Sequence, residues 1–399
     1  MKYNGWTLAL ISAGVVSLPA VTHAEESTNV VLTAIAATTI SGYVDASAHW
    51  NPGTGNNNLP IYSPNGKPGG LKADGFNLDV VALTISKPVG EGDWGAGYNA
   101  TLLFGPDAVG YNTSPLAGPS DFSLKDAYVD LHAPLGNGLD IKLGTFTEIL
   151  GYEVYETGNN PNYTRSYGYE IEPTALTGAL ATYQFSKVIT AQAGIADTWS
   201  AGLNSRGFVP PGTKAESYKT YIGGVTLTAP DSLGFLAGST LSGGVINGYD
   251  AANLTDKTSW YVGGTFKTPC KCLTVGLSYD YVNLANKTIG VPKAGYQSAV
   301  DAYLLVQATD KLSFNTRVEY FSQSQYLAAT DGISGLAEEA FALTETVQYD
   351  LWKNVISRLE FRWDHSLDGV AAYGGSSVAN PGPSLKNAFL VAANIVYKF

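Results

Sequence analysis

The sequence contains few charged residues, two cysteines and no long apolar run beyond its N-terminal segment. Charged residues make up 14 % of the 399 residues, and the single methionine is Met1. A membrane-spanning helix needs ~20 consecutive, mostly apolar residues, and no segment after residue 24 supplies them. The sequence therefore excludes a helical membrane protein, and its shortage of charged helix-forming residues argues against a helix-rich soluble domain.

Basic residues are outnumbered by acidic ones. The chain has 23 Lys and Arg against 34 Asp and Glu, which gives a formal net charge of −11 at pH 7. Binding to nucleic acid requires clustered Lys and Arg that neutralise phosphates. We therefore expect no nucleic-acid partner.

The two cysteines are Cys270 and Cys272, with one residue between them. A single C-x-C pair cannot fill a four-ligand zinc site, and the few histidines are distant in the sequence. We therefore expect no metal and no cofactor. Outside the cytoplasm such a pair can be oxidised, and the sequence leaves a disulfide and two free thiols equally open.

The first 24 residues have the pattern of a secretory signal peptide. Lys2 precedes a short apolar run at 6–16, and Pro19 precedes a small-residue cleavage site that ends at Ala24. This is the order of charged, apolar and cleavage regions in such peptides. We expect residues 1–24 to be removed on export, 25–38 to form a short periplasmic leader, and 39–399 to form the folded domain.

The rest of the chain is rich in glycine and tyrosine, with 45 and 25 residues, and repeats one unit. Each unit is about ten residues of alternating character followed by turn residues. Strands of this length suit a tilted membrane crossing, which needs ~9–11 residues, better than a soluble sheet. The sixteen predicted strands cover 39–49, 76–87, 92–105, 122–133, 137–147, 174–186, 188–197, 216–229, 235–250, 256–268, 272–284, 296–309, 311–323, 337–350, 352–366 and 386–398.

The connections alternate between short and long along the chain, and this pattern is typical of an up-and-down outer-membrane β-barrel. Its short turns lie in the periplasm and its long loops at the cell surface. We predict an all-β, transmembrane, antiparallel barrel of about 16 strands, within a range of 14 to 18. A barrel of this width leaves an aqueous interior unless its own loops narrow it.

Several strands have one apolar and one charged face, because successive strand residues point to opposite sides. In 355–365, for example, Leu359, Phe361 and Trp363 alternate with charged residues. We expect the charged faces to line the pore. The predicted pore-lining residues are Asp126, Asp130, Asp140, Lys142, Arg317, Glu319, Arg358, Glu360, Arg362 and Asp364.

The tryptophans after the signal peptide all lie near predicted strand ends, whereas a soluble core would bury most of them mid-strand. This placement predicts two aromatic girdles against the lipid, formed by Trp50, Trp94, Trp199, Trp260, Trp352 and Trp363.

Two residues conflict with the alternation of apolar and charged strand faces. Lys125 shares the apolar parity of its strand, from which a strand-end lysine can reach the interface. Glu345 also falls on an apolar face, which questions the assigned register.

The last strand ends in a terminal phenylalanine. In "AFLVAANIVYKF", alternate residues from Phe389 to Phe399 are apolar or aromatic. This pattern resembles the C-terminal strand signal of bacterial outer-membrane proteins. It predicts outer-membrane lipid and the barrel assembly machinery as partners, the latter through Phe399.

Residues 141–199 resemble the OmpL-like family of β-barrel porins. The matching segments are "KLGTFTEILGYEV", "NPNYTRSY", Pro173, "LTGALATYQFS" and "AGIADTW". Thr164 stands where the family has Ser, and Leu176 replaces a frequent His, so no role of that His is carried over. The resemblance implies an outer-membrane porin, and it makes an oligomer, such as a trimer, plausible.

We therefore expect a porin through which small hydrophilic solutes or ions diffuse. The alternative is a surface adhesin or receptor that uses its long loops without channel activity. A soluble glycan-binding protein fits the tryptophans and the terminal Phe399 less well. We expect no enzyme, because none of His49, His132 and His365 lies in a catalytic motif.

The segment 148–173 contains five Glu, five Tyr and one Arg, without a clean period. By position it is the third long loop, which in general porins often folds inward. The sequence leaves an inward constriction loop and an outer surface loop equally open. For the inward arrangement we expect the constriction to be formed by Glu148, Tyr152, Glu153, Glu156, Tyr163, Arg165 and Glu170.

Overall fold

The computed structural model describes residues 37–62, 74–90, 94–111, 113, 120–199, 202–207, 217–251, 255–285, 294–325, 337–375 and 382–399. The predicted signal peptide and nearly all of the predicted leader lie outside these residues. The described strands are β1 Thr39–Trp50, β2 Gly75–Lys87, β3 Gly95–Phe104, β4 Phe122–Ala133, β5 Leu139–Thr147, β6 Ala175–Gln184, β7 Ile189–Ala196, β8 Thr220–Thr228, β9 Thr240–Asp250, β10 Thr255–Lys267, β11 Leu273–Ala285, β12 Gly295–Gln307, β13 Leu312–Gln323, β14 Glu339–Trp352, β15 Val355–Ser366 and β16 Asn387–Lys398. The predicted sixteen strands are thus confirmed, each to within a few residues.

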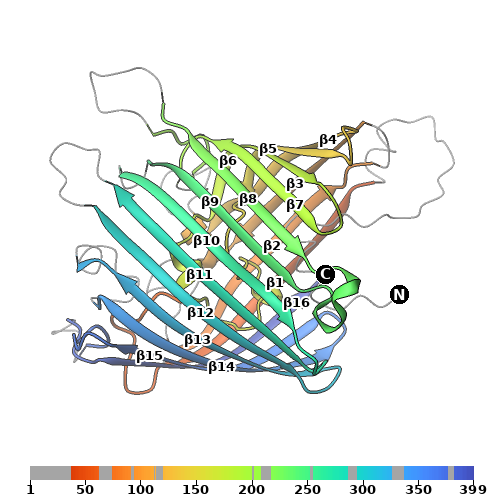
Figure 1. The fold of residues 1–399 in the computed structure, drawn as a ribbon. Coiled ribbons are helices and arrows are strands. Elements are labelled where there is room, and N and C mark those ends of the chain that lie inside the picture. Colours follow the sequence, from red (N-terminus) through yellow and green to blue (C-terminus); the bar gives the residue numbers. More distant parts are fainter. Residues whose placement is uncertain are drawn as a thin grey trace, which may run out of the picture.

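The sixteen strands form one closed antiparallel barrel in which each strand pairs with its neighbour in sequence. The barrel closes where β1 pairs with β16, with Ala46 opposite Ile395. At the end of this seam, Gly42 and Phe399 exchange two backbone hydrogen bonds of 3.0 Å. In Figure 1 the strands wind obliquely around the barrel, and this tilt is what closure of a sheet requires.

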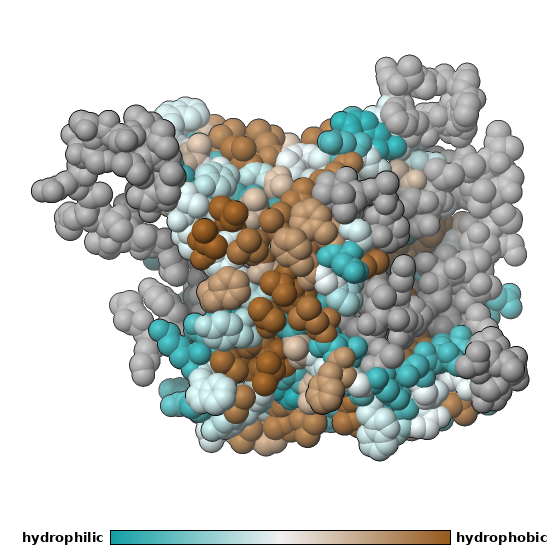
Figure 2. Space-filling view, turned by 180° about the vertical axis from the view of Figure 1, so that it is seen from behind, coloured by the Kyte–Doolittle hydropathy of each residue, from teal (hydrophilic) through white to brown (hydrophobic). Residues whose placement is uncertain are grey.

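The two faces of each strand differ as the alternation predicts. On β15, Leu359 is 57 % exposed on the outside, whereas its neighbour Glu360 is 1 % exposed and faces inward. Apolar side chains gather in the middle of the outer wall, between more hydrophilic rims (Figure 2). The barrel is therefore apolar outside and polar inside, the reverse of a soluble sandwich.

The tryptophan prediction is wrong at one position. Trp50, Trp94, Trp260 and Trp352 are exposed on the outside, and Trp363 lies on the same outward face of β15 as Leu359. The remaining tryptophan, Trp199, is buried and donates a 3.0 Å hydrogen bond from Nε1 to Ser259 Oγ. It follows the end of β7, where the chain turns over the interior instead of continuing along the wall.

A β-bulge explains the conflict at Lys125. Thr101 pairs with Asp126 and Leu102 with Leu124, so Lys125 is an extra residue in β4. The bulge turns the side chains of Lys125 and Asp126 to the same inner side, where both are buried. The expectation that Lys125 reaches out to the interface is therefore wrong.

The register around Glu345 was assigned correctly. Glu345 is exposed on the apolar outer face of β14, as its parity predicts. Thr316 Oγ1, on the neighbouring strand, donates a 2.9 Å hydrogen bond to Glu345 Oε2. By contrast, the turn predicted at Asp350 and Leu351 lies three residues later, at Lys353 and Asn354. β14 continues to Trp352, and Asn354 adopts the positive φ of 68° that the tight turn requires.

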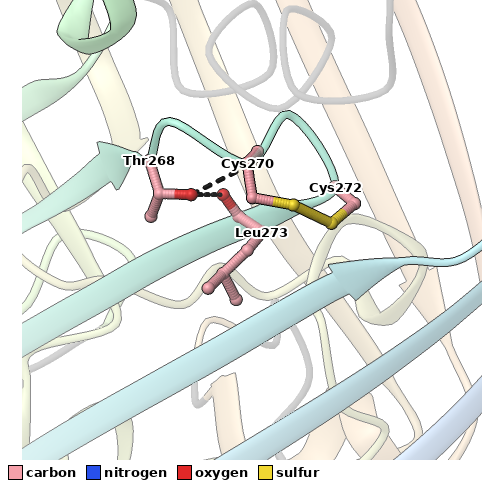
Figure 3. The surroundings of a disulfide bond; sticks show 4 residues. All are labelled: Thr268, Cys270, Cys272 and Leu273. Carbon is pink, nitrogen blue, oxygen red and sulfur yellow. Dashed lines mark hydrogen bonds between the residues drawn. A yellow bond between two sulfur atoms is a disulfide. The ribbon is translucent and has the colours of Figure 1, made fainter.

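The short turn between β10 and β11 contains a disulfide between Cys270 and Cys272 (Figure 3). Thr268 Oγ1 donates 2.9 Å hydrogen bonds to the carbonyl oxygens of Cys270 and Leu273, which brace the same turn. The disulfide decides between the oxidised pair and the two free thiols that the sequence left open.

None of the helices in the described part of the chain has the length and apolar character that a membrane crossing requires.

Candidate functional site

Residues 148–173, called the inner loop below, connect β5 to β6 and lie inside the barrel. The loop contains two short helices, η1 Thr157–Asn159 and α4 Tyr167–Ile171. Its residues form hydrogen bonds with inward-facing side chains of β13, β14 and β15. These partners are about 150 to 200 positions away in the sequence. The loop therefore crosses the interior instead of covering the outer surface.

Arg317 of β13 is the centre of the contact between the inner loop and the wall. Its Nη1 lies 2.7 Å from Glu153 Oε1 of the loop, and its Nε lies 2.7 Å from Glu319 Oε2 of its own strand. The same guanidinium donates to the carbonyl oxygens of Thr164 and Arg165. All three charged side chains of this cluster are fully buried. A buried charge is tolerated only when it is paired and hydrogen-bonded in this way.

Two further arginines and one glutamate of β15 hold the backbone of the loop. Arg358 donates to the carbonyl oxygens of Thr157 and Asn160, at 2.8 and 2.7 Å. Arg362 donates to the carbonyl oxygen of Arg165 at 2.5 Å. Glu360 accepts hydrogen bonds from the amides of Tyr163 and Thr164, at 2.6 and 2.9 Å. The wall thus satisfies backbone groups that a buried loop would otherwise leave unpaired.

The second half of the loop is held by a helix cap and by aromatic contacts. The Ser166 hydroxyl accepts from the amide of Tyr169 and so caps α4. The Tyr167 amide donates to Glu319 Oε1 at 2.7 Å, and its hydroxyl donates to Asp364 Oδ1 at 2.8 Å. Its ring stacks on Phe321 with centroids 5.0 Å apart. Tyr167 therefore packs the loop against the wall while its hydroxyl remains hydrogen-bonded.

The first residues of the loop are held by apolar packing on the opposite side of the barrel. Leu150 belongs to a buried cluster that includes Leu180, Ile222 and Ile246 of β6, β8 and β9. Tyr152 stacks on Tyr303 of β12, with ring centroids 4.2 Å apart. This end of the loop therefore depends on shape, whereas the far end depends on charge.

Carboxylates gather where the loop returns to the wall. Burial, Asp280 and Glu148 together raise the pKa of Glu172 well above its ordinary value. Burial is also the main cause that raises the pKa of Glu148. Glu170 has a pKa of about 8, raised by burial against the opposing effect of Arg165. Burial thus shifts all three loop carboxyls toward their protonated form, which reduces their mutual repulsion.

The ten predicted pore-lining residues face the interior but divide into two groups. Arg317, Glu319, Arg358, Glu360, Arg362 and Asp364 are at most 4 % exposed and contact the inner loop or one another. Asp126 is buried beside Lys125. Only Asp130, Asp140 and Lys142, on β4 and β5, remain partly exposed. Most of the predicted lining therefore lies beneath the loop instead of against open water.

The predicted loop residues are spread along both legs of the loop. Glu153 contacts Arg317, Tyr152 packs on Tyr303, and Glu148 accepts a hydrogen bond from the amide of Leu150. Tyr163 and Arg165 are buried, with Arg165 Nη2 donating to the carbonyl oxygen of Tyr155. Glu156 contacts Lys125 across the interior at 3.0 Å. Glu170 is partly exposed in α4, but its Oε1 atom is buried.

The sequence did not predict several residues of the site, including His49, Asp79, Asn162 and Thr346. The Tyr163 hydroxyl lies 2.8 Å from His49 Nε2 of β1 and donates to Asp79 Oδ2 of β2 at 3.1 Å. Asn162 donates to Thr346 Oγ1 of β14 at 2.7 Å. Their signal in the sequence is weak, because alternation shows only that a polar residue points inward. It does not show whether that residue meets water or a loop. For Lys125 the signal was present, since two adjacent charged residues in a strand break the alternation.

A metal or catalytic centre is not apparent in the part of the chain that the structure describes. No group of three or more His, Cys, Asp or Glu residues there is arranged to hold a metal ion. His132 Nδ1 contacts Asp140 Oδ1 at 2.6 Å, and His49 contacts Tyr163. The site is a packed network of paired charges around a loop, beside a buried apolar cluster on β6, β8 and β9.

Comparison with known proteins agrees with this architecture. The family model described as "Putative beta-barrel porin-2, OmpL-like" matches residues 37–399. No curated protein sequence matches the chain. Solved structures with a similar fold include the outer membrane channel DcaP of Acinetobacter baumannii, with a TM-score of 0.58 and 14 % identity over 91 % of this chain and 97 % of that one.

Two further structures share the fold at similar distance. The anion-selective porin from Comamonas acidovorans has a TM-score of 0.55 and 12 % identity, covering 91 % of this chain and 99 % of its own. The trimer form of OmpT, an outer membrane protein of Vibrio cholerae, has a TM-score of 0.53 and 12 % identity over the same shares of the two chains. At these identities the likeness shows the fold alone.

Proposed function

Because the chain belongs to the OmpL-like family of β-barrel porins, we propose that it forms a water-filled outer-membrane channel for small hydrophilic solutes or ions. In this proposal the inner loop narrows the channel. The single observation that carries it is the fixed position of the loop across a sixteen-strand interior, where Arg317, Arg358 and Glu360 hold it. A loop held so firmly can set the width of the passage that remains.

The test is conductance of the purified protein in planar bilayers, with deletion of residues 156–168 as the decisive variant. We expect stepwise conductance from the intact protein and a larger step from the deletion variant, because the loop occupies space that ions would use. An unchanged step would contradict a narrowing role for the loop. A folded barrel without conductance would favour the adhesin or receptor alternative instead.

Two further features support the proposed location of the barrel in the outer membrane and its assembly there. The apolar outer wall suits outer-membrane lipid, and Phe399 at the end of the β16 seam suits recognition by the barrel assembly machinery. We also propose a homo-oligomer, for which the trimer form of the similar OmpT structure offers a precedent. Chemical crosslinking in native membranes would report the number of copies, and only monomers would contradict it.

A further inference from the structure

The inner loop does not cover the two sides of the barrel equally. On β13 to β15, inward-facing Arg317, Thr346 and Arg362 are 0 to 1 % exposed. On β7 to β9, inward-facing Gln192, Thr226 and Ser242 remain partly exposed, and Thr226 and Ser242 lie side by side at 3.0 Å. Leu150 covers Ile222 and Ile246 on the second wall, so the open space lies off-centre, against the part of that wall around Gln192, Thr226 and Ser242.

The first leg of the inner loop presents an edge to this space. Val154 and Glu156 are partly exposed, whereas Glu153 and Tyr155 beside them are buried. This alternation is that of an extended segment with one covered and one open side. The open side carries a single ionisable carboxylate, that of Glu156.

Glu156 is joined to the wall of β4 by Lys125, the residue that the β-bulge turns inward. Lys125 Nζ lies 3.0 Å from Glu156 Oε1, 2.9 Å from Asp126 Oδ2 and 2.9 Å from Thr147 Oγ1. Among the described residues, two ion pairs join the inner loop to the barrel wall, and the other is the fully buried Glu153–Arg317 pair. The Lys125–Glu156 pair is therefore the charged contact on the open side of the loop.

We propose that the solute passage runs between the open edge of the inner loop and the wall of β4 to β9, and that the Lys125–Glu156 pair determines which solutes pass. This proposal rests on the channel function proposed above. One ammonium group faces two carboxylates there, Glu156 and Asp126, so the local charge is −1. Asp130, Asp140 and Lys142 follow on the same wall, so carboxylates still outnumber ammonium groups by four to two. The passage therefore selects small cations over anions.

The selectivity test compares Glu156→Gln and Lys125→Met with Lys257→Met. Lys257 forms a similarly buried pair with Asp250 at 2.9 Å, away from the loop edge, and is the matched control. We expect Glu156→Gln to lower and Lys125→Met to raise the cation-to-anion permeability ratio. The expected change is about sevenfold, because one unit charge ~7 Å from an ion alters its energy by about RT in water, with opposite signs for a cation and an anion. An equal shift in Lys257→Met would overturn the proposal.

A second measurement does not depend on conductance. Thr226→Cys lies on the proposed passage, and Thr344→Cys lies beneath the loop, where Thr344 is fully buried. The native cysteines are joined in a disulfide, so a charged thiol reagent reports only the introduced residue. We expect rapid labelling of Thr226→Cys and slow labelling of Thr344→Cys in folded, heat-modifiable protein. Equal labelling rates would overturn the passage, whereas unequal rates without conductance would overturn the channel function alone.

Discussion

The two sides of the barrel interior carry the same kinds of charged residue, but these residues have different surroundings. On β13 to β15, Arg317, Arg362 and Glu360 are buried and bonded to the inner loop. On β4 and β5, Asp130 and Lys142 are partly exposed, and Lys142 Nζ lies 4.8 Å above the Tyr128 ring. Charged residues hold a loop on one side and face space on the other. An inward-facing charge is therefore not by itself a pore-lining charge.

The largest expected difference between the two sides is in stability. Arg317→Met leaves Glu153 buried without its charged partner and Glu319 with only Arg362 at 3.9 Å, and breaking such a buried pair typically costs about 3–5 kcal/mol. Lys142→Met removes a partly exposed charge and should cost less than about 1 kcal/mol. Urea titration of folded protein in lipid vesicles measures the free energy of unfolding of both variants. Equal losses would remove the distinction between the two walls.

A smaller effect is expected where the loop is held by neutral donors. Glu360 accepts from two loop amides and from Thr346 Oγ1 at 2.6 Å, and Glu360→Gln places an amide group against those donors. We expect a loss of about 1–3 kcal/mol in the free energy of unfolding. The matched control is Asp130→Asn on the open wall, which should change stability little. Protection of the loop from proteolysis should fall in the first variant only.

A third expected effect concerns pH. The pKa of Glu170 is raised from 4.5 to about 8 by burial, so the folded protein holds a proton that the unfolded chain releases. Stability from this group is present below about pH 4.5 and declines as pH rises toward 8. Glu170→Gln should weaken this decline, measured as the urea midpoint at pH 5 and pH 9.

The matched control for the pH experiment has the opposite sign. Hydrogen bonds from Ser366 and from the amides of Val370 and Glu338 lower the pKa of Asp368, which lies beyond β15. Its contribution is present at neutral pH and is lost only in acid. Asp368→Asn should therefore leave the interval from pH 5 to pH 9 unchanged. A decline abolished by this variant would contradict the assignment to Glu170.

The strands could be predicted from the sequence because the pattern that identifies each strand lies within its own residues. Alternation, strand length and turn residues are local, so β15 could be placed without knowledge of its neighbours. The exceptions are also local, since the extra residue Lys125 and the late turn at Asn354 alter the count by only a few residues. Trp199 was wrongly assigned to the outer girdle because the chain leaves the wall after β7. The amino-acid sequence gives no sign of this change of direction.

The contacts of the inner loop could not be predicted in the same way. Alternation shows that Arg358 and Arg362 point inward, but it does not distinguish water from a loop backbone as their partner. The donors and acceptors that meet, such as Arg358 and the Thr157 carbonyl oxygen, are 201 positions apart. Pairing over such a separation depends on the closed barrel, and a single sequence contains no record of it.

The seam between β1 and β16 has a consequence for the order of assembly. The inner loop bonds to His49 and Asp79 near the start of the barrel and to Arg358 and Glu360 near its end. These partners lie at opposite ends of the chain, and only the pairing of β1 with β16 joins them into one continuous wall. The complete set of loop contacts therefore forms only when the seam has closed, so the last strand of the chain completes both the wall and the binding of the inner loop.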